Sequence, residues 1–438
     1  MPHSVNAVDD LDFWLQHIAA VHPREIELGL ERIRAVAQRM ELVKPARHVV
    51  IVAGTNGKGS TVAGLEALLE CAGYRTAAYT SPHIHHFNER VRIGRAEVAD
   101  RQLCAAFACV EANRGEISLS YFEFATLAAL WLFNRSELDV AILEVGLGGR
   151  LDAVNIVEAD LVVITNISLD HQDWLGADLE SIAAEKAGVI RPMVPVVYGD
   201  SEPRMSIVNK ARQLQSPLLM TPVDCRCEVN NAGSGWTFTG QDATGAEVLL
   251  QDLPVPGIAL CNAVLAIQAM ALLPVQFDVA AVRTALGGLQ VAGRFEPRID
   301  TQTGRKIIFD VAHNRGGAAH LAEGLLVLRR NNPAIREIAV VMAVMADKDI
   351  EEMVEALESC LDICYIAQVD EPRCMPVDEA YSRLERLGYG SVLRRYDNAV
   401  AAYRAACRET TDEDLVVVTG SFFTVAATRN LSKAKLEA

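Results

Sequence analysis

The sequence predicts an α/β protein with two domains. Its 438 residues exceed the size at which a single hydrophobic core keeps growing, so two domains are expected. Apolar runs rich in valine and isoleucine alternate with segments of helical periodicity, a pattern typical of parallel sheets buried on both faces. Hydrophobic residues make up 50% of the chain and charged residues 22%, as in globular proteins.

The elements of the first domain follow one another in order. Residues 11–40 have apolar side chains at helical spacing, with a break near His22 and Pro23, and predict one or two covering helices. Residues 48–54 predict a strand that runs through a glycine loop into a helix at 60–70. Further strands are predicted at 75–80, 138–145, 160–166 and 195–199, and further helices at 121–134 and 179–190. This order predicts a doubly wound domain with a parallel central sheet.

The rest of the chain predicts a small β appendage and a second α/β domain. Between about 200 and 256, polar segments with Gly, Asn and Thr favour hairpins over helices. Helices are predicted at 261–273 and 278–287, and the segment 287–297, bounded by Gly and Pro, marks the domain boundary. We place it so that the domains span 1–293 and 294–438, the second with strands at 306–314, 337–345, 361–369 and 414–421.

The charge and the cysteines exclude several classes of partner. A net charge of −16 disfavours nonspecific binding to nucleic acid or to an anionic membrane surface. The acidic start MPHSVNAVDDLDFW does not resemble a signal peptide, and no uncharged apolar run reaches the roughly 18 residues of a membrane span. The ten cysteines are scattered without zinc-site spacing, so we expect reduced thiols and a cytoplasmic protein.

The glycine-rich segment after the first predicted strand carries the strongest chemical pattern. It comprises Gly54, Thr55, Asn56, Gly57, Lys58, Gly59, Ser60 and Thr61. Glycines let backbone N–H groups approach phosphate oxygens, while the helix N-terminus adds about half a positive charge and Lys58 a full one. The strict phosphate-loop pattern is not met, because Val52 replaces its first glycine and Gly59 separates Lys58 from Ser60. A glycine turn with a solvated lysine is the alternative.

Charged residues also follow two predicted strands. Glu144 ends the strand 138–145, and open α/β sheets bind ligands at the carboxyl ends of their strands, so Glu144 is placed to hold magnesium. Asp170 and His171 follow the strand 160–166 at the same edge. Solvation of Glu144 and packing of His171 stay open as alternatives. Together with the glycine loop, these residues predict a magnesium-ATP site at one edge of the parallel sheet, a site that would suit the transfer of a phosphoryl group.

Over nearly its whole length the sequence resembles the bifunctional dihydrofolate synthase and folylpolyglutamate synthase family, which is related to the Mur ligases. The resemblance rests on GTNGKGS (54–60), TSPH (80–83), NERVR (88–92), YFEF (121–124), LEVGLGGRLDA (143–153), LDHQDWLG (169–176), EKAG (185–188), GRFE (293–296), FDVAHN (309–314) and GSFFTVA (420–426). It implies a Mur-ligase-like P-loop domain with a small β appendage, followed by a Rossmann-like α/β domain.

The resemblance also implies roles for individual residues. Residues 54–61 resemble the ATP phosphate cradle, and Ser81, Glu144 and His171 the magnesium ligands. Lys186 is similar to the family lysine that becomes carbamylated and helps to hold a second magnesium ion, although the sequence alone predicts a solvated helix residue there. The implied catalytic residues are Lys58, His171, Lys186 and His313, and the implied further ATP contacts, shared between both domains, are Asn262, Arg294 and Asp310.

Three segments resemble positions that bind dihydropteroate in the bifunctional enzymes. They contain Glu27, Leu28 and Gly29; Ser120, Tyr121, Phe122 and Glu123; and Leu151, Asp152 and Ala153. Helix packing is the alternative for the aromatic segment, while His313 and Ser421 resemble positions on the folate or glutamate side of the site. Monofunctional relatives lack the dihydropteroate site, so the segment 28–32 favours two activities. Arg315, where the family leads us to expect proline, is expected to alter the local turn.

The predicted function is ligation of L-glutamate to dihydropteroate and to the γ-carboxyl of tetrahydrofolate. ATP and two magnesium ions are the expected cofactors, with a monovalent cation as an option, and a monomer without nucleic-acid or membrane partners is expected. The alternatives are a monofunctional folylpolyglutamate synthase, a Mur-type ligase for UDP-muramoyl peptides, and a nucleotide-gated binding module without turnover. YFEF and FDVAHN favour folate, and a binding module would not need Glu144, His171 and Lys186 together.

Overall fold

The computed structural model describes residues 10–22, 24, 27–230 and 235–434. Proximity of Cα atoms divides the chain into two compact units, one formed by residues 1–256 and 260–289 and the other by 257–259 and 290–438. The boundary at 293/294 stays a prediction. Pro23 lies outside the described residues, but the helices α1 (Leu11–Ala20) and α2 (Glu31–Arg39) on either side confirm the predicted helical pair.

The first unit is built on an eight-stranded sheet of order β4-β3-β2-β5-β1-β6-β7-β8. Its strands are β1 (His48–Ala53), β2 (Thr76–Tyr79), β3 (Val91–Ile93), β4 (Ala96–Glu97), β5 (Val140–Glu144), β6 (Leu161–Ile164), β7 (Val196–Tyr198) and β8 (Leu218–Met220). The six strands from β2 to β8 in this order are parallel, and β3 and β4 add an antiparallel edge. The central strand β1 is fully buried from Val49 to Ala53, because both faces of the sheet are covered.

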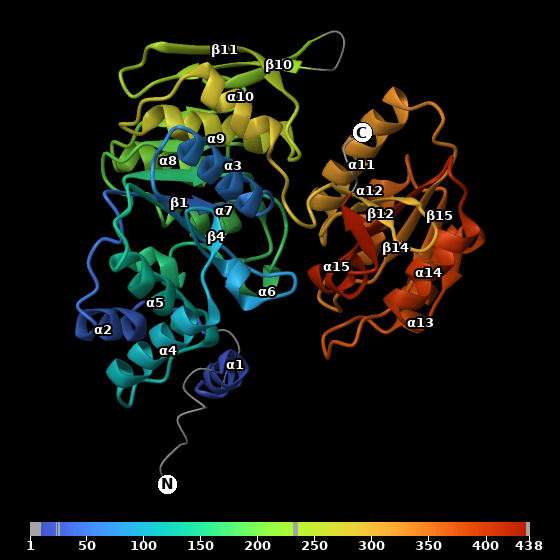
Figure 1. Ribbon diagram of the computed structural model, residues 1–438, viewed down its shortest axis with the longest axis horizontal. Coiled ribbons are helices and arrows are strands. Elements are labelled where there is room, and N and C mark those ends of the chain that lie inside the picture. Colours follow the sequence, from blue (N-terminus) through green and yellow to red (C-terminus); the bar gives the residue numbers. More distant parts are fainter. Residues whose placement is uncertain (1–9, 23, 25–26, 231–234, 435–438) are drawn as a thin grey trace. The chain divides into compact units, whose positions relative to one another are not determined.

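Helices cover both faces of this sheet. The remaining helices of the unit are α3 (Lys58–Cys71), α4 (Asp100–Arg114), α5 (Tyr121–Asn134), α6 (Gln172–Leu175), α7 (Leu179–Ala187), α8 (Met205–Gln213), α9 (Leu260–Leu272) and α10 (Val279–Gly287), with 3₁₀ turns η1 (Phe87–Arg90) and η2 (Ala153–Ile156). Figure 1 shows α3 and α9 on one side of β1 and α4 and α5 on the other. The predicted doubly wound parallel domain is therefore confirmed.

The β appendage is smaller than the sequence suggested. It is the three-stranded antiparallel sheet of β9 (Arg226–Val229), β10 (Gly235–Gln241) and β11 (Glu247–Pro254). The prediction of hairpins from residue 200 onward was wrong, because α8 and β8 occupy that region and β8 extends the main sheet. The pattern of α8 was weak because this helix buries only Ile207 and Ala211.

The second unit is a seven-stranded sheet of order β16-β15-β14-β17-β13-β12-β18. Its strands are β12 (Glu296–Asp300), β13 (Lys306–Phe309), β14 (Ile338–Met342), β15 (Ile363–Ile366), β16 (Leu393–Arg395), β17 (Leu415–Thr419) and β18 (Ser432–Ala434). Its helices are α11 (Arg315–Asn331), α12 (Ile350–Leu357), α13 (Val377–Arg386), α14 (Ala399–Glu409) and α15 (Phe422–Arg429), with the 3₁₀ turn η3 (Tyr389–Ser391). The five strands from β16 to β13 are parallel, as predicted, while β12 and β18 form an antiparallel edge that the sequence did not reveal.

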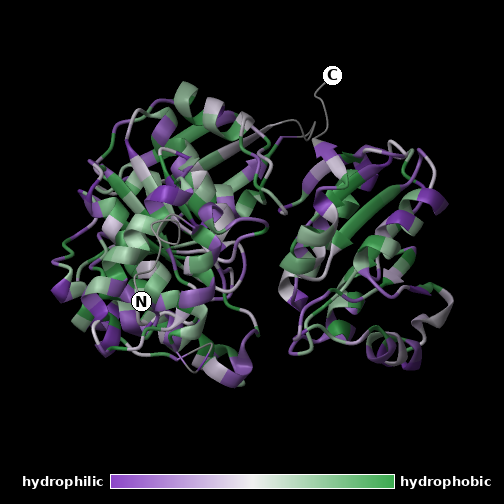
Figure 2. Cartoon of the chain, turned by 60° about the horizontal axis from the view of Figure 1, so that its bottom comes forward, coloured by the Kyte–Doolittle hydropathy of each residue, from purple (hydrophilic) through white to green (hydrophobic). Residues whose placement is uncertain are grey.

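Hydrophobic residues are concentrated in the sheets of both units. In Figure 2 the strands of the second unit are coloured mainly as hydrophobic, and polar colours concentrate on loops and outer helix faces. Among the residues that the structure describes, we find no helix with the length and apolar character of a membrane span.

Candidate functional site

The glycine loop between β1 and α3 is held in a fixed shape by the neighbouring strand β6. The N–H of Thr55 donates to the carbonyl of Asn166 (2.9 Å), and the Thr165 hydroxyl donates to the carbonyl of Asn56 (2.6 Å). Gly54 adopts a φ of +135°, and a Cβ there would lie 1.9 Å from the Thr165 hydroxyl. Only glycine fits such a position. Thr165 and Asn166 were not predicted as loop anchors, although both directly follow a strand at the same edge.

The second glycine of the loop makes room for Asn262. Gly57 has a φ of +85° and immediately precedes α3, and a Cβ on it would lie 2.3 Å from the Asn262 Oδ1. Asn262, on α9, is therefore beside the loop, where the sequence placed an ATP contact. The N-cap of α3 is Gly57, which has no side chain to accept the first N–H groups of this 14-residue helix, and a helix N-terminus of this kind can receive an anion.

Two lysines converge on the loop backbone. The Lys58 ammonium donates to the carbonyls of Gly54 (3.1 Å) and Thr55 (3.0 Å), and the Lys186 ammonium donates to Gly54 from 2.9 Å. Lys186 is only 4% exposed, so the sequence-based expectation of a solvated residue was wrong. Ile182, Ala183 and Ala187 are buried on the same face of α7, and this spacing was the available sign that Lys186 faces inward.

The Lys186 amine is electrostatically unusual. Its burial, followed by the nearby charge of Lys58, lowers the pKa of Lys186 from 10.5 to about 7. Asp170 and Asp152 act in the opposite direction. Since a buried charged amine is costly, a much larger share of Lys186 is neutral near pH 7 than of an exposed lysine.

The carboxyl ends of the strands bring several oxygen atoms toward the loop. Glu144, at the end of β5, is 3% exposed, and its Oε2 accepts the N–H of Ser81 (3.2 Å). A Cβ on Gly59 would lie 3.5 Å from the same oxygen, so Glu144 faces the first turn of α3. The Thr61 hydroxyl is buried without a hydrogen-bond partner among the described residues. A hydroxyl, a carboxylate and the N-terminus of a helix fit a magnesium-bound phosphate.

His171 lies at the same edge of the sheet, after β6. Its backbone has a φ of +51°, its N–H donates to Asp170 Oδ1 (2.9 Å), and it precedes α6. The described residues contain no group of three His, Cys, Asp or Glu side chains arranged as a metal site. Magnesium commonly takes only one or two protein carboxylates, with phosphates and water completing its shell. The roles of Ser81, Glu144, His171 and Lys186 as ligands therefore stay predictions.

The three segments predicted to bind the acceptor meet in the first unit. The N–H of Gly29 donates to the carbonyl of Leu151 (3.4 Å), which joins the segment 27–29 to the segment 151–153. Phe122 lies against Gly146, where a Cβ would be 2.6 Å from the ring, and its ring centre is 5.8 Å from that of Tyr79. Within the aromatic segment, Phe124 lies in the core, as the alternative of helix packing predicted, and Tyr121 and Phe122 are half-buried and pack against the edge of the same core.

Asp152 connects the acceptor segments to the lysines. It is 2% exposed, and it accepts the N–H groups of Leu147 (2.8 Å) and Val154 (3.0 Å). Burial raises the pKa of Asp152 to about 6, against the opposing effects of these hydrogen bonds and of the Lys58 charge. Ala153 follows it as the first residue of η2.

The predicted residues of the second unit gather at the carboxyl ends of β13 and β17. Asp310 is half-buried and accepts the N–H groups of Phe295 (2.8 Å) and Ala312 (2.9 Å), and desolvation of its carboxyl raises its pKa against the opposing charge of Arg294. The rings of His313 and Phe422 are 6.0 Å apart, and Arg294 lies 5.3 Å from the same Phe422 ring.

Two helices of this unit begin at residues that the sequence analysis singled out, Ser421 and Arg315. Ser421 caps α15 by accepting the N–H of Thr424 (3.0 Å). Arg315 is the first residue of α11, and Asn314 caps that helix by accepting the N–H of Gly317 (2.8 Å). Proline is common at the first position of a helix but is not required there, so α11 can begin with Arg315.

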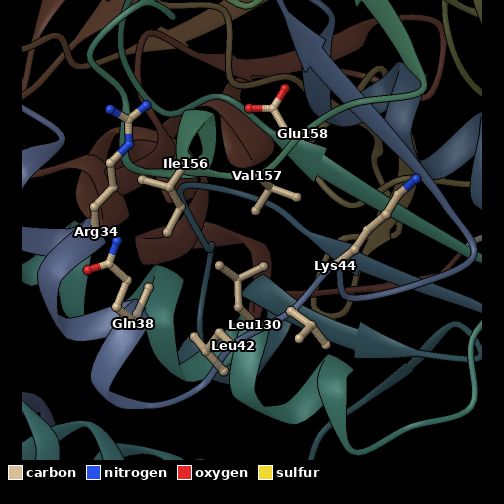
Figure 3. A pocket seen from close by; sticks show the side chains of 10 residues that line it. Arg34, Gln38, Leu42, Lys44, Leu130, Ile156, Val157 and Glu158 are labelled. Carbon is tan, nitrogen blue, oxygen red and sulfur yellow. The ribbon is translucent and has the colours of Figure 1, made fainter.

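A pocket of about 370 Å³ lies elsewhere in the first unit (Figure 3). Its lining includes Arg34 and Lys44, and none of the predicted site residues. Lys44 pairs with Asp160 at 2.6 Å, and Glu158 pairs with Arg191 at 2.7 Å. The charges of Lys44 and Glu158 are thus compensated, and the pocket is not part of the site.

Comparisons with known proteins agree with this geometry. The Mur ligase middle domain matches residues 52–217, and the Mur ligase glutamate ligase domain matches residues 293–422. The dihydrofolate synthase/folylpolyglutamate synthase of Escherichia coli is 40% identical over 96% of this chain and 95% of its own length. The chain belongs to the dihydrofolate synthase/folylpolyglutamate synthase family. The predicted membership in this family of Mur ligases, and the predicted fold class, are thus confirmed.

Solved structures of the family extend the agreement to three dimensions. FolC of E. coli in complex with DHPP and ADP has a TM-score of 0.89 and 38% identity, covering 98% of this chain and 99% of that chain. The enzyme of Yersinia pestis complexed with AMPPNP and a Mn ion has a TM-score of 0.88 and 39% identity, with coverage of 98% and 99%.

Proposed function

We propose that this protein is an ATP- and magnesium-dependent ligase that joins L-glutamate to dihydropteroate and to the γ-carboxyl of tetrahydrofolate. ADP and phosphate are the other products. The observation that carries this proposal is the joint placement of the glycine loop, two lysines and Glu144 beside three acceptor-type segments, in a chain 40% identical to a bifunctional relative. We further propose that it acts as a monomer in the cytoplasm.

The glycine loop supports the nucleotide part of the proposal. Backbone N–H groups at the start of α3 and the Lys58 ammonium would hold the phosphates of ATP, and Asn262 beside Gly57 would contact the nucleotide. In the second unit, Arg294 and Asp310 are the proposed further ATP contacts. Preorganised positive groups stabilise the charge on a transferring phosphoryl group without reorganisation during the reaction.

Glu144, Ser81, His171 and Lys186 are the residues that we propose to hold magnesium. The ion would neutralise charge on the transferring phosphoryl group. Lysine becomes an oxygen ligand only after carbamylation, in which the uncharged amine forms a bond to the carbon of carbon dioxide and loses a proton. With a pKa of about 7, roughly half of the Lys186 amine is uncharged at pH 7. Its environment therefore favours this modification.

The proposed reaction proceeds through an acyl phosphate. A carboxylate oxygen of the acceptor attacks the γ-phosphorus of ATP, the bond from that phosphorus to the bridging oxygen breaks, and ADP leaves. The amine of glutamate, after losing a proton, then attacks the activated carbonyl carbon, and phosphate leaves. His313 and Ser421 are the proposed residues on the glutamate side, and the chain contributes mainly by positioning both reactants.

The acceptor segments support dihydropteroate as the first acceptor. Tyr121 and Phe122 offer half-buried aromatic faces for a flat pteridine, and the buried Asp152 offers a hydrogen-bond acceptor. The segment around Leu28 and Gly29 contacts Leu151, and we propose that the aromatic segment lines the same site. We therefore propose the bifunctional enzyme rather than the monofunctional one.

A panel of acceptors tests this function. Phosphate release is measured with ATP, magnesium and glutamate, and with dihydropteroate, tetrahydrofolate or a UDP-muramoyl peptide as acceptor. Release with the first two acceptors only is expected. Release with tetrahydrofolate alone would indicate a monofunctional synthase, release with the UDP-muramoyl peptide a Mur-type ligase, and nucleotide binding without turnover a binding module.

A further inference from the structure

Arg32, in the first turn of α2, connects two of the acceptor segments. On one side its Nη1 donates to Oε1 of Glu27 (2.5 Å), and its Nη2 donates to the Glu27 carbonyl (3.0 Å). On the other side its Nε donates to Oε2 of Glu123 (3.4 Å), and its Nη2 lies 3.2 Å from Oε1 of that residue. One guanidinium group thus spans the loop before α2 and the start of α5.

Glu123, which contacts Arg32, also forms hydrogen bonds at the start of α5, where the aromatic segment lies. Its Oε2 also accepts the N–H of Ser120 (2.8 Å), and its own N–H donates to the Ser120 hydroxyl (3.3 Å). This reciprocal cap fixes the first turn of α5, where Tyr121 and Phe122 lie. The orientation of both aromatic side chains therefore depends on the position of the Glu123 carboxylate.

The loop on the other side of Arg32 reaches the third segment. Glu27 precedes Gly29 by two residues, and the N–H of Gly29 donates to Leu151 (3.4 Å), next to Asp152. The contacts of Glu27 with Arg32 add to this long backbone contact, and Oε2 of Glu27 also lies 3.4 Å from Nε2 of His22 and 3.6 Å from Nη1 of Arg24. Arg32 thus contacts two of the three acceptor segments directly, and the loop that it holds contacts the third through the backbone of Gly29.

The contacts of Arg32 with Glu27 and Glu123 require an arginine at this position. Glu123 is buried, and a buried carboxylate needs compensation by charge and hydrogen bonds. Guanidinium can donate in two directions at once in a fixed plane, whereas a lysine ammonium is a compact point charge that cannot span both carboxylates. Arg32→Lys would preserve the charge while removing the bridge.

We propose that Arg32 is a positioning residue for the pteroate-type acceptor, acting through Glu27 and through the Ser120–Glu123 cap. This inference rests on the proposed function and adds to it a residue that determines acceptor affinity. ATP and magnesium binding should be independent of it, because the glycine loop is anchored by β6 and α9 and not by α2.

The test compares Arg32→Lys with a matched variant on the same helix, Arg39→Lys. Arg39 also ties α2 to another helix, by donating to the carbonyls of Asn113 (3.3 Å) and Arg114 (2.7 Å), but it touches no acceptor segment. For Arg32→Lys, KM for dihydropteroate should rise roughly ten- to a hundredfold, as expected for a misplaced binding surface, while kcat and KM for ATP stay near those of the unmodified chain. Arg39→Lys should leave all three unchanged.

The outcomes separate this inference from the function on which it rests. An unchanged KM for dihydropteroate in a less stable Arg32→Lys would mean a merely structural role and overturn the inference alone. If that variant does not fold, Glu27→Gln, which removes one charge at a side chain 30% exposed, should raise the same KM, and an unchanged value would overturn the inference. The unmodified chain failing to release phosphate with dihydropteroate would overturn the proposed function and the inference together.

Discussion

Replacing Lys186 by methionine is expected to stabilise the protein while removing activity. The Lys186 amine is buried, and its pKa falls from 10.5 to about 7, mainly because of burial and then because of Lys58. This difference corresponds to an unfavourable free energy on the order of 5 kcal/mol for the charged amine in the folded state. Methionine has a similar length and carries no charge.

The lost hydrogen bond offsets only part of this gain. Lys186 donates to the Gly54 carbonyl, but Lys58 donates to the same oxygen from 3.1 Å and keeps it satisfied in the variant. Removing a hydrogen bond from a charged donor costs about 1.5 to 3 kcal/mol. At pH 7 the variant should therefore be more stable by about 2 to 3 kcal/mol.

The sign of the pH dependence follows from the lowered pKa. Below about pH 7 the amine is charged in the folded and unfolded states, so the folded protein bears the full cost. Between about pH 7 and 10.5 the unfolded state binds more protons, so the stability of the unmodified chain rises with pH and approaches that of the variant.

Urea unfolding of both proteins measures this difference, in buffer free of metal and bicarbonate so that the amine stays unmodified. The expected result is a stability difference that shrinks as the pH rises across that window. A methionine variant that is less stable at pH 7, or a difference that does not change with pH, would refute the account of Lys186 as a strained, buried amine.

Four further substitutions, one of them made on top of another, test the loop and its metal. Lys58→Ala should lower kcat by a factor of about 10² to 10³, measured by phosphate release, because it removes one preorganised positive group; a rate near that of the unmodified chain would contradict its role. Gly57→Ala should raise KM for ATP and cost about 1 to 2 kcal/mol in urea unfolding, since alanine is strained at positive φ. Adding Asn262→Ala to the Gly57→Ala variant should not restore the stability that is lost to the positive φ of residue 57. Glu144→Gln should raise the magnesium concentration for half-maximal rate, and an unchanged magnesium titration would exclude Glu144 as a ligand.

The sequence revealed those features of the fold that depend on strong local patterns. The buried positions of β1 are all apolar, and those from Val49 to Val52 are β-branched, so its strand and the following helix were evident. The gathering of Glu144 and the glycine loop at one edge followed from parallel topology alone. Here the structure adds the contact of Glu144 with Ser81.

Other features depended on tertiary contacts that no local pattern encodes. The burial of Lys186 is set by its packing against the glycine loop, and composition alone favoured exposure. Arg32 stood in a recognised segment, but only the approach of α2 to α5 pairs it with Glu123. The antiparallel strands β12 and β18 pair over more than a hundred residues of chain, which periodicity cannot report.

The most direct test of the central claim follows one oxygen atom. Dihydropteroate labelled with ¹⁸O in its carboxylate is incubated with the protein, ATP, magnesium and glutamate, and the released phosphate is analysed by mass spectrometry. If the carboxylate is activated as an acyl phosphate, each phosphate carries one oxygen from the acceptor. Phosphate without the label, released at the rate of dihydrofolate formation, would contradict the account.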